Sequence, residues 1–220
     1  HTRSHCDWIQ TCALPICATS FETVKTEKEI LDLFHSQFPD AIKLMPNLVE
    51  DFQKNLTGDL ASVYCNPWHL GDKALLIGDA AHAVVPFFGQ GMNASFQDCS
   101  PLSKLMDQNE NDWNTIFNAF SSTQVENGHA IADIALENYL EMRDHVNDTE
   151  YKKRRNVELK LERMFPGQFI PRYSMVSFHQ IPYAEVYQRG GKQSKIIRDV
   201  LKADPSGQSI DKDMVEKMMP

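Results

Sequence analysis

A short apolar run followed by an aspartate is the first feature of the sequence that could support chemistry. The run Lys73–Ile77 reads KALLI, and its apolar residues before Gly78 predict a buried strand that ends in a turn. Asp79 would then lie at the carboxyl end of the strand, where ligands of open α/β sheets usually bind. A carboxylate at such a place acts only as a hydrogen-bond acceptor.

A glycine-containing segment, Gly89–Asn93, is the second candidate binding element. The helical pattern Met92–Met106 predicts that Gly91–Asn93 form the first turn of a helix. A helix start presents free N–H groups and a positive partial charge of about half a unit, which favour an electron-rich ligand. Glycines at such a place let the backbone approach a flat ligand closely.

The same glycines also fit the dinucleotide fingerprint G-x-G-x-x-A, over Gly89–Ala94. That fingerprint requires the first glycine directly after a strand, whereas eleven residues separate Ile77 from Gly89. We therefore reject it as a diphosphate-binding loop. No G-x-G-x-x-G occurs elsewhere in the sequence, so this chain is not predicted to hold a cofactor diphosphate by itself.

Composition and charge limit the class of protein. The 220 residues are 42% hydrophobic, enough for a sizeable core, and carry a formal net charge of -8. The negative charge argues against nucleic acid and anionic membranes as partners. No transmembrane helix or anchor is expected, because no apolar run approaches the required length of about 18 residues. The polar carboxyl terminus favours a cytoplasmic bacterial protein.

Residues 1–17 do not fit with the rest of the sequence. They contain three of the five cysteines and show neither helical nor strand periodicity. Their histidines and cysteines fit no familiar zinc spacing, so no metal site is predicted. The segment resembles the product of sequencing-adapter read-through, and we interpret it as a non-native leader. The remaining thiols, Cys65 and Cys99, are expected to be reduced and in or near the core.

The segment after the leader is predicted to form two short helices and a strand. Thr26 and Glu29 have the spacing of a capping box, which opens a helix that continues to about Phe38. A second helical stretch is Asn47–Lys54, and Leu60–Cys65 is a strand candidate. These short elements precede the apolar run described above.

The second half of the sequence is predicted to be mainly helical. Trp113–Val146 has the pattern of one long helix, or of two helices with a bend near Asn127 and Gly128. Asn138 is a polar residue on the apolar face of this helix. Its amide either bonds to neighbouring backbone or binds a substrate. The later segments are a helix at Glu150–Phe165, a short apolar segment at Tyr173–Phe178, and an amphipathic helix from Pro182 onward.

The string GDAAH, then a proline, GQGMN and an acidic residue resembles the second flavin-contacting motif of the FAD-dependent aromatic hydroxylases. The strings VPFFGQGMNA, YSMVSF and IPY most resemble the kynurenine-hydroxylating members of that family, and the resemblance covers about Ser20 to Val200. It implies FAD as cofactor, NADPH as reductant, and kynurenine and molecular oxygen as reactants. The implied activity converts L-kynurenine to 3-hydroxykynurenine in tryptophan degradation and NAD biosynthesis.

The resemblance also implies which residues contact the flavin. Asp79 would bind a ribitol hydroxyl, and the helix start Gly91–Asn93 would face the pyrimidine edge of the isoalloxazine ring. His82 is expected to be structural, and no residue is predicted to be a catalytic acid or base. The expected FAD-binding residues are Gly78, Asp79, Pro86, Gly89, Gly91, Met92 and Asn93.

Four residues are expected at the substrate. By the same resemblance, Asn138 and Tyr173 would meet the amino-acid end of kynurenine. Phe87 and Phe88 would form the wall of the reaction chamber between flavin and substrate. A tyrosine with a satisfied hydroxyl in the core is the simpler interpretation of Tyr173.

Departures from the family pattern leave alternatives open. The usual N-A-G-F-E-D is NASFQD here, at Asn93–Asp98, and residues 121–129 lack expected charges. The diphosphate loop and the arginine and tyrosine of the carboxylate clamp would lie upstream. The chain is therefore expected to be the carboxyl-terminal half of an enzyme. The alternatives are a flavin hydroxylase of another aromatic acid and an inactive fragment without the dinucleotide fingerprint.

The predicted fold is an α/β (α+β) fragment in four segments. It contains part of the parallel sheet of an FAD-binding domain and ends in a mainly helical region. The segments are the leader 1–17, the end of a substrate domain at 18–66, the second FAD-contacting segment at 67–110, and the helical carboxyl-terminal region at 111–220.

Overall fold

The computed structural model describes residues 5–11, 23–55, 58, 60–145 and 148–219. The chain divides into two compact units. We call Ile9–Ala61 the small unit, and His1–Trp8 with Ser62–Pro220 the main unit. The predicted segments 67–110 and 111–220 both lie in the main unit, which contains the candidate site.

The small unit has its own apolar core. Helix α1, Glu27–Gln37, begins with the predicted capping box, in which the Thr26 hydroxyl accepts from the Glu29 N–H at 3.3 Å. The Glu29 carboxylate accepts from the Thr26 N–H at 2.9 Å, and these backbone bonds lower the pKa of Glu29. A short 3-10 helix, Ile42–Leu44, and helix α2, Leu48–Lys54, follow. The core residues are Val24, Ile30, Phe34 and Leu48.

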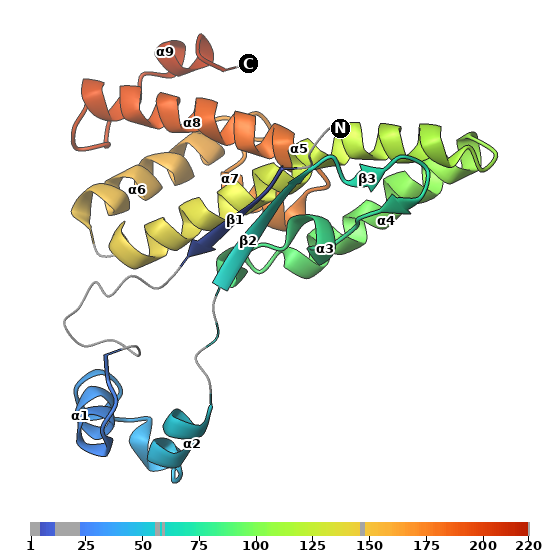
Figure 1. Ribbon diagram of the computed structural model, residues 1–220. Helices are drawn as coiled ribbons and strands as arrows, with labels where there is room; N and C mark the ends of the chain where they lie inside the picture. Colours follow the sequence, from blue (N-terminus) through green and yellow to red (C-terminus); the bar gives the residue numbers. More distant parts are fainter. Residues whose placement is uncertain (1–4, 12–22, 56–57, 59, 146–147, 220) are drawn as a thin grey trace. The chain divides into compact units, whose positions relative to one another are not determined.

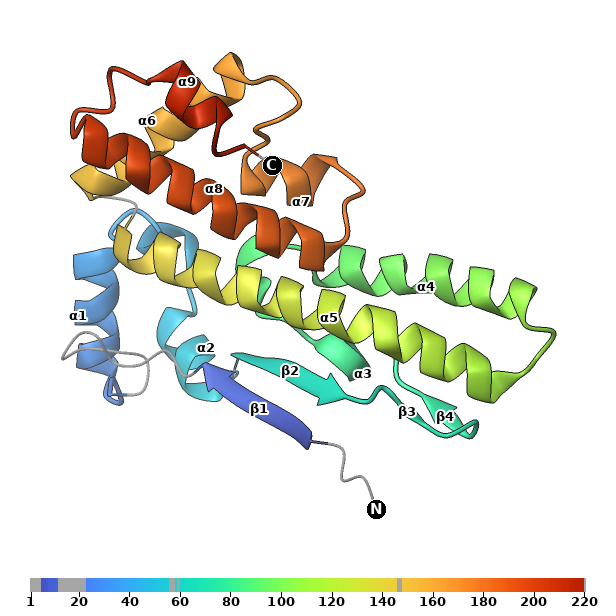
Figure 2. The same ribbon diagram turned by 90° about the horizontal axis from the view of Figure 1, so that it is seen from above.

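The strands are short and form two pairs. Strands β1, His5–Thr11, and β2, Leu60–Asn66, form one two-stranded sheet (Figure 2). Strands β3, His69–Leu70, and β4, Ala74–Leu75, form an antiparallel hairpin. The strand predicted at residues 60–65 is confirmed. Residues 5–11 thus form a strand although the sequence of 1–17 shows no strand periodicity; His1, Cys12 and Cys17 lie outside the described residues.

The predicted strand Lys73–Ile77 is largely wrong. Only Ala74–Leu75 is a strand, and its pairing is antiparallel rather than part of a parallel sheet. Leu76 and Ile77 are 39% and 42% exposed. A continuous apolar run forms a buried strand only where neighbouring elements cover both faces. Within the part of the chain that the structure describes, β3 is the only strand that pairs with β4.

Helix α5 is the central element of the main unit. It is a single helix, Trp113–Leu140, without a break at Gly128, and it packs against α4, α8, α3 and the 3-10 helix η2 (Figures 1 and 2). A π-helical turn, Glu141–His145, follows it. The other helices are α3 Asp79–His82, η2 Pro86–Phe88, α4 Gly91–Gln108, α6 Thr149–Met164, α7 Arg172–Phe178, α8 Tyr183–Ala203 and α9 Lys212–Glu216.

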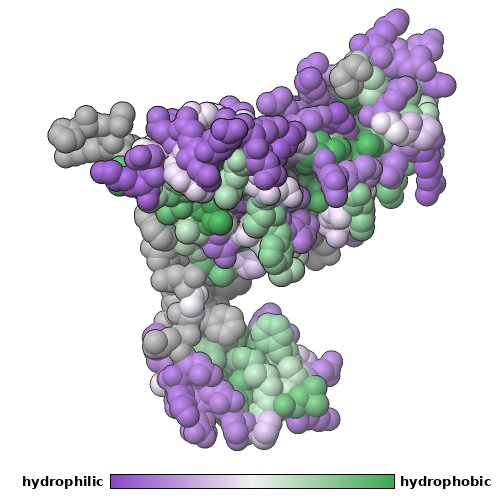
Figure 3. Space-filling model, turned by 90° about the vertical axis from the view of Figure 1, so that its right-hand side faces the viewer, coloured by the Kyte–Doolittle hydropathy of each residue, from purple (hydrophilic) through white to green (hydrophobic). Residues whose placement is uncertain are grey.

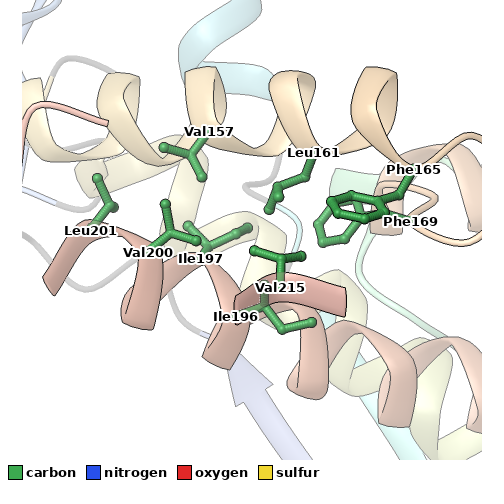
Figure 4. Close-up of a cluster of buried hydrophobic side chains, with 9 residues drawn as sticks. All are labelled: Val157, Leu161, Phe165, Phe169, Ile196, Ile197, Val200, Leu201 and Val215. Atoms are coloured by element: carbon green, nitrogen blue, oxygen red, sulfur yellow. The ribbon is translucent and has the colours of Figure 1, made fainter. Parts of the chain in front are cut away.

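Three apolar clusters lie within the main unit. One surrounds Trp68 and Phe120, and a second contains Ile131, Ile134 and Met175. The third packs α6, α8 and α9 together (Figure 4) through Val157, Leu161, Phe165, Phe169, Ile196, Ile197, Val200, Leu201 and Val215. The α/β class and the mainly helical carboxyl-terminal region are thus confirmed.

Some apolar residues of the main unit remain at the surface. Hydrophobic and hydrophilic regions adjoin one another in the space-filling view (Figure 3). Leu70, Met92 and Phe96 are 71%, 69% and 67% exposed. Cys65 is buried as expected, whereas Cys99 is exposed. No helix in the described ranges has both the length and the hydropathy needed to cross a membrane.

Candidate cofactor and substrate site

Asp79 lies just after the β3–β4 hairpin, as the first residue of α3. Gly78 precedes it with φ 59° and ψ -143°, a conformation that glycine adopts without steric cost. The Asp79 side chain is exposed, and the Ser95 hydroxyl donates to its Oδ1 at 3.3 Å. No described lysine or arginine pairs with it. Asp79 thus follows the last residue of β4 by four positions, and the described residues show no ion pair at its carboxylate.

A buried pair of side chains supports this turn. Asp98 Oδ2 accepts from the Gly78 N–H at 2.9 Å and lies 2.8 Å from His82 Nε2. Asp98 and His82 are 4% and 2% exposed. His82 therefore contacts Asp98 in the interior, which agrees with the structural role expected for it.

Trp68 covers the other side of His82. The two rings stack with their centroids 5.0 Å apart. The indole N–H of Trp68 donates to Cys65 O at 2.9 Å, and its backbone N–H donates to the Ser121 hydroxyl at 3.0 Å. A methyl group at Gly128 would lie 2.6 Å from the Trp68 ring, so α5 can pass here only with a glycine at this position.

The start of α4 is open, as predicted. Helix α4 begins at Gly91, and no described residue accepts from the N–H groups of Gly91–Asn93. Gln90 precedes it without a side-chain capping bond, and its amide oxygen accepts from Asn93 Nδ2 at 3.0 Å. Gly89 has φ 66°, which turns the chain from η2 into the helix. The first turn of α4 thus presents free donors at the surface.

The end of α5 holds the η2 segment in place. Asn138 Nδ2 donates to Phe87 O at 2.8 Å and contacts Met142 Sδ at 3.4 Å. The Phe87 ring packs on Tyr139, with 4.3 Å between ring centroids. Pro86 begins η2 and is exposed. The amide nitrogen of Asn138 is therefore bonded to backbone, as the first of the two interpretations of this residue expects.

Asn138 and Tyr173 line the same cavity, which has a volume of about 570 Å³. Phe88 also lines it, and its ring centroid lies 5.6 Å from that of Tyr173. The predicted convergence of these residues is confirmed. Phe87 is not part of the lining, because its ring is turned toward Tyr139. Tyr173 is 54% exposed and lies on a helix, α7, rather than in the core.

The charged residues of this cavity were not predicted from the sequence. Arg172 forms an ion pair with Glu137, and both line the cavity. A methyl group at Gly190 would lie 2.8 Å from Arg172 Cδ, so a glycine in α8 makes room for the arginine. Gly190 and Gly191 were the sequence signal that could have indicated this contact, because a glycine inside a helical pattern often marks a place where another group approaches the helix closely.

Tyr183, in the string IPY, supports the start of α4 from a distance. Its hydroxyl lies 3.4 Å from Gln90 Oε1, and the residue is 4% exposed. Burial is the main cause that raises the pKa of Tyr183 to about 12. The Tyr183 hydroxyl thus donates a hydrogen bond to Gln90, the residue that precedes α4.

Comparisons with known proteins found one family model and several relatives that match this chain. Residues 17–114 match the family described as "FAD binding domain". The chain is 43% identical to kynurenine 3-monooxygenase of Myxococcus xanthus, over 87% of this chain and 41% of that protein. It is 42% identical to the Anopheles gambiae protein of that name, over 88% and 40%, and 40% identical to the Sus scrofa protein, over 87% and 41%.

Asp79 and the open start of α4 both lie within the stretch that matches the FAD-binding family model. These three relatives, which each match 87% or 88% of this chain, all have the name kynurenine 3-monooxygenase. The chain spans about two fifths of the length of these relatives.

Proposed function

We propose that the chain is part of an NADPH- and FAD-dependent monooxygenase that converts L-kynurenine to 3-hydroxykynurenine. The observation that carries the proposal is the arrangement of Asp79 and the start of α4 in a chain 43% identical to a kynurenine 3-monooxygenase. When bound, FAD would supply the redox chemistry that passes electrons from NADPH to oxygen. The residues of this chain bind and orient the cofactor and the substrate.

The described residues fit FAD in their chemistry. The Asp79 carboxylate is exposed and has no cationic partner within the described ranges, so it can accept from a ribitol hydroxyl. The free N–H groups of Gly91–Asn93 can donate to the electron-rich edge of the flavin ring. No side chain extends from Gly89, where a Cβ would meet nothing within 4 Å. We also assign Gly78, Pro86 and Met92 to the wall of this site.

The cavity fits the amino-acid end of the substrate. The Asn138 side chain contacts Phe87 O and Met142 Sδ, and both contacts are made by its Nδ2 group. Its Oδ1 is therefore the part left for a ligand, and an oxygen acceptor suits an ammonium group better than a carboxylate. The Tyr173 hydroxyl can donate to the carboxylate, and the Phe88 ring packs beside it.

The activity belongs to the whole protein rather than to this stretch. By the family resemblance, the diphosphate loop and the remaining substrate-binding residues would lie in upstream sequence. We therefore expect the 220-residue chain alone to bind FAD weakly and not to hydroxylate kynurenine. Micromolar or tighter FAD binding by this chain would show that the cofactor is held elsewhere than proposed.

A chimera provides the direct test of function. In it, residues 18–220 replace the matching stretch of the Myxococcus xanthus kynurenine 3-monooxygenase. We expect a yellow protein whose NADPH oxidation rises when kynurenine is added and which forms 3-hydroxykynurenine. Stimulation by another aromatic acid in place of kynurenine would favour the related hydroxylase. A colourless, folded chimera would contradict the assignment of the FAD site.

A further inference from the structure

A single carboxylate oxygen of α4 joins the two ends of α3. Asp98 Oδ2 accepts from Gly78, the residue before α3, and contacts His82, its last residue, at 2.9 and 2.8 Å. The side chains of Asp98 and His82 are almost fully buried, so water does not compete for these bonds. Hydrogen bonds to a charged group in such an environment are stronger than neutral ones.

In the contact between His82 and Asp98, the proton lies on the histidine ring nitrogen. A carboxylate accepts only, so His82 Nε2 is the donor. His82 Nδ1 has no hydrogen-bond partner among the described residues, and the ring stacks on Trp68. The bond to Asp98 is therefore the polar contact that fixes the orientation of His82.

The same contacts fix Asp79 against α4. Asp79 follows Gly78 directly, and its Oδ1 receives the Ser95 hydroxyl at 3.3 Å. A methyl group at Gly78 would lie only 3.1 Å from Ser95 Oγ, so α3 meets α4 without space for a side chain. Gly91 lies two turns before Asp98 on the same helix, about 10 Å away at the α-helical rise.

We propose that Asp98 is a positioning residue of the FAD site. Through Gly78 and His82, it sets the Asp79 carboxylate at a fixed distance from the free N–H groups that begin α4. Asp98 is buried and does not touch the cofactor. The inference rests on the proposed function, and it explains why an acidic residue follows the glycine-containing segment at this spacing.

The first measurement uses the 220-residue chain. In the Asp98→Asn variant, we expect amide hydrogen exchange at Gly78 to become at least about tenfold faster, while amides of α8 keep their rates. The matched control is Asp107→Asn, which removes an exposed carboxylate from the same helix. The control should leave exchange at Gly78 unchanged.

The second measurement uses the chimera and determines the FAD dissociation constant. Asp98→Asn and Gly78→Ala should each weaken FAD binding about tenfold, and Asp107→Asn by less than about twofold. At saturating FAD, the KM for kynurenine should stay unchanged in Asp98→Asn. A general loss of structure would change KM and the exchange of α8 as well.

The outcomes separate the two proposals. A wild-type chimera that takes up no FAD contradicts the proposed function, and the inference fails with it. Normal FAD affinity in both Asp98→Asn and Gly78→Ala overturns the inference while the proposed function stands. If Asp98→Asn fails to fold, Gly78→Ala decides alone: weakened FAD binding supports the positioning role, and wild-type affinity overturns it.

Discussion

The junction between α3 and α4 and the cavity around Tyr173 are held by different kinds of contact. At the junction, Asp98 and His82 are both buried. One carboxylate oxygen of Asp98 contacts the His82 ring and also accepts from the backbone N–H of Gly78. At the cavity, Tyr173 is half exposed and Arg172 pairs with an exposed Glu137. Buried charge-assisted bonds are costly to break, whereas exposed ion pairs contribute about 0–1 kcal/mol.

This difference agrees with the two proposed ligands. A cofactor that stays bound is best held by groups whose positions are fixed before binding. A substrate that enters and a product that leaves require walls that can move, and such walls come from the less stable parts of a fold. We therefore expect substitutions at the junction to reduce stability more than substitutions at the cavity.

The largest effect is expected at Trp68, which is fully buried on His82. Trp68→Ala should lower the free energy of unfolding by about 3–5 kcal/mol, because it removes a large buried ring and the hydrogen bond from its indole N–H to Cys65 O. Urea denaturation measures this value. The matched control is Trp113→Ala, since Trp113 is 38% exposed and should cost far less. Equal losses in the two variants would contradict the special rigidity of the junction.

Two glycines sharpen the same comparison. Gly128→Ala places a methyl group against the rigid Trp68 ring and should destabilise the protein by about 1–3 kcal/mol. Gly190→Ala meets Arg172 Cδ, which can move away, so its cost should be much smaller. Gly191→Ala meets nothing within 4 Å and reports the gain in helix propensity, up to about 1 kcal/mol. Thermal unfolding of the three variants should rank them in this order.

Local patterns in the sequence predicted the features that depend on neighbouring residues. The capping box of Thr26 and Glu29 and the start of α4 at Gly91 both follow from short-range chemistry. The family resemblance added Asn138 and Tyr173, which are far apart in sequence and line one cavity. These predictions did not require knowledge of the tertiary packing.

Features that depend on distant partners were not predictable. The run Lys73–Ile77 is apolar enough for a buried strand, but strand formation depends on which strands lie beside it. The role of Asp98 depends on contacts 16 and 20 residues away, across a turn whose geometry the sequence does not give. Arg172 meets Glu137 across 35 residues, between two helices.

A smaller effect is expected at the cavity, for Asn138. Asn138→Ala in the chimera should raise the KM for kynurenine about three- to tenfold, because it removes one acceptor and frees the Phe87 carbonyl. The FAD dissociation constant should not change. Asn118→Ala is the matched control, since Asn118 bonds only within α5 and is exposed. A changed FAD affinity with unchanged KM would place Asn138 at the cofactor instead.

The smallest effect concerns Asp204, at the end of α8 and outside both regions. Its carboxylate accepts from the Ser206 hydroxyl and from the backbone N–H groups of Ser206, Gln208 and Ser209. These bonds lower the pKa of Asp204 to about 2, with the Ser206 hydroxyl as the largest cause. Because the folded pKa lies below the unfolded value, the stabilisation is present above about pH 4 and is lost as the pH falls toward about 2.

Asp204→Ala should therefore lower the Tm slightly at pH 7, and the difference from wild type should shrink as the pH falls through this window. Thermal unfolding at several pH values measures it. Asp107→Ala removes an exposed carboxylate that makes no hydrogen bond among the described residues, and it should show no such window. Because the turn at Asp204 belongs to neither region, FAD and kynurenine binding by the chimera should stay unchanged. A change in either affinity would mean that the two regions are coupled to the end of α8, and the comparison between them would have to be redrawn.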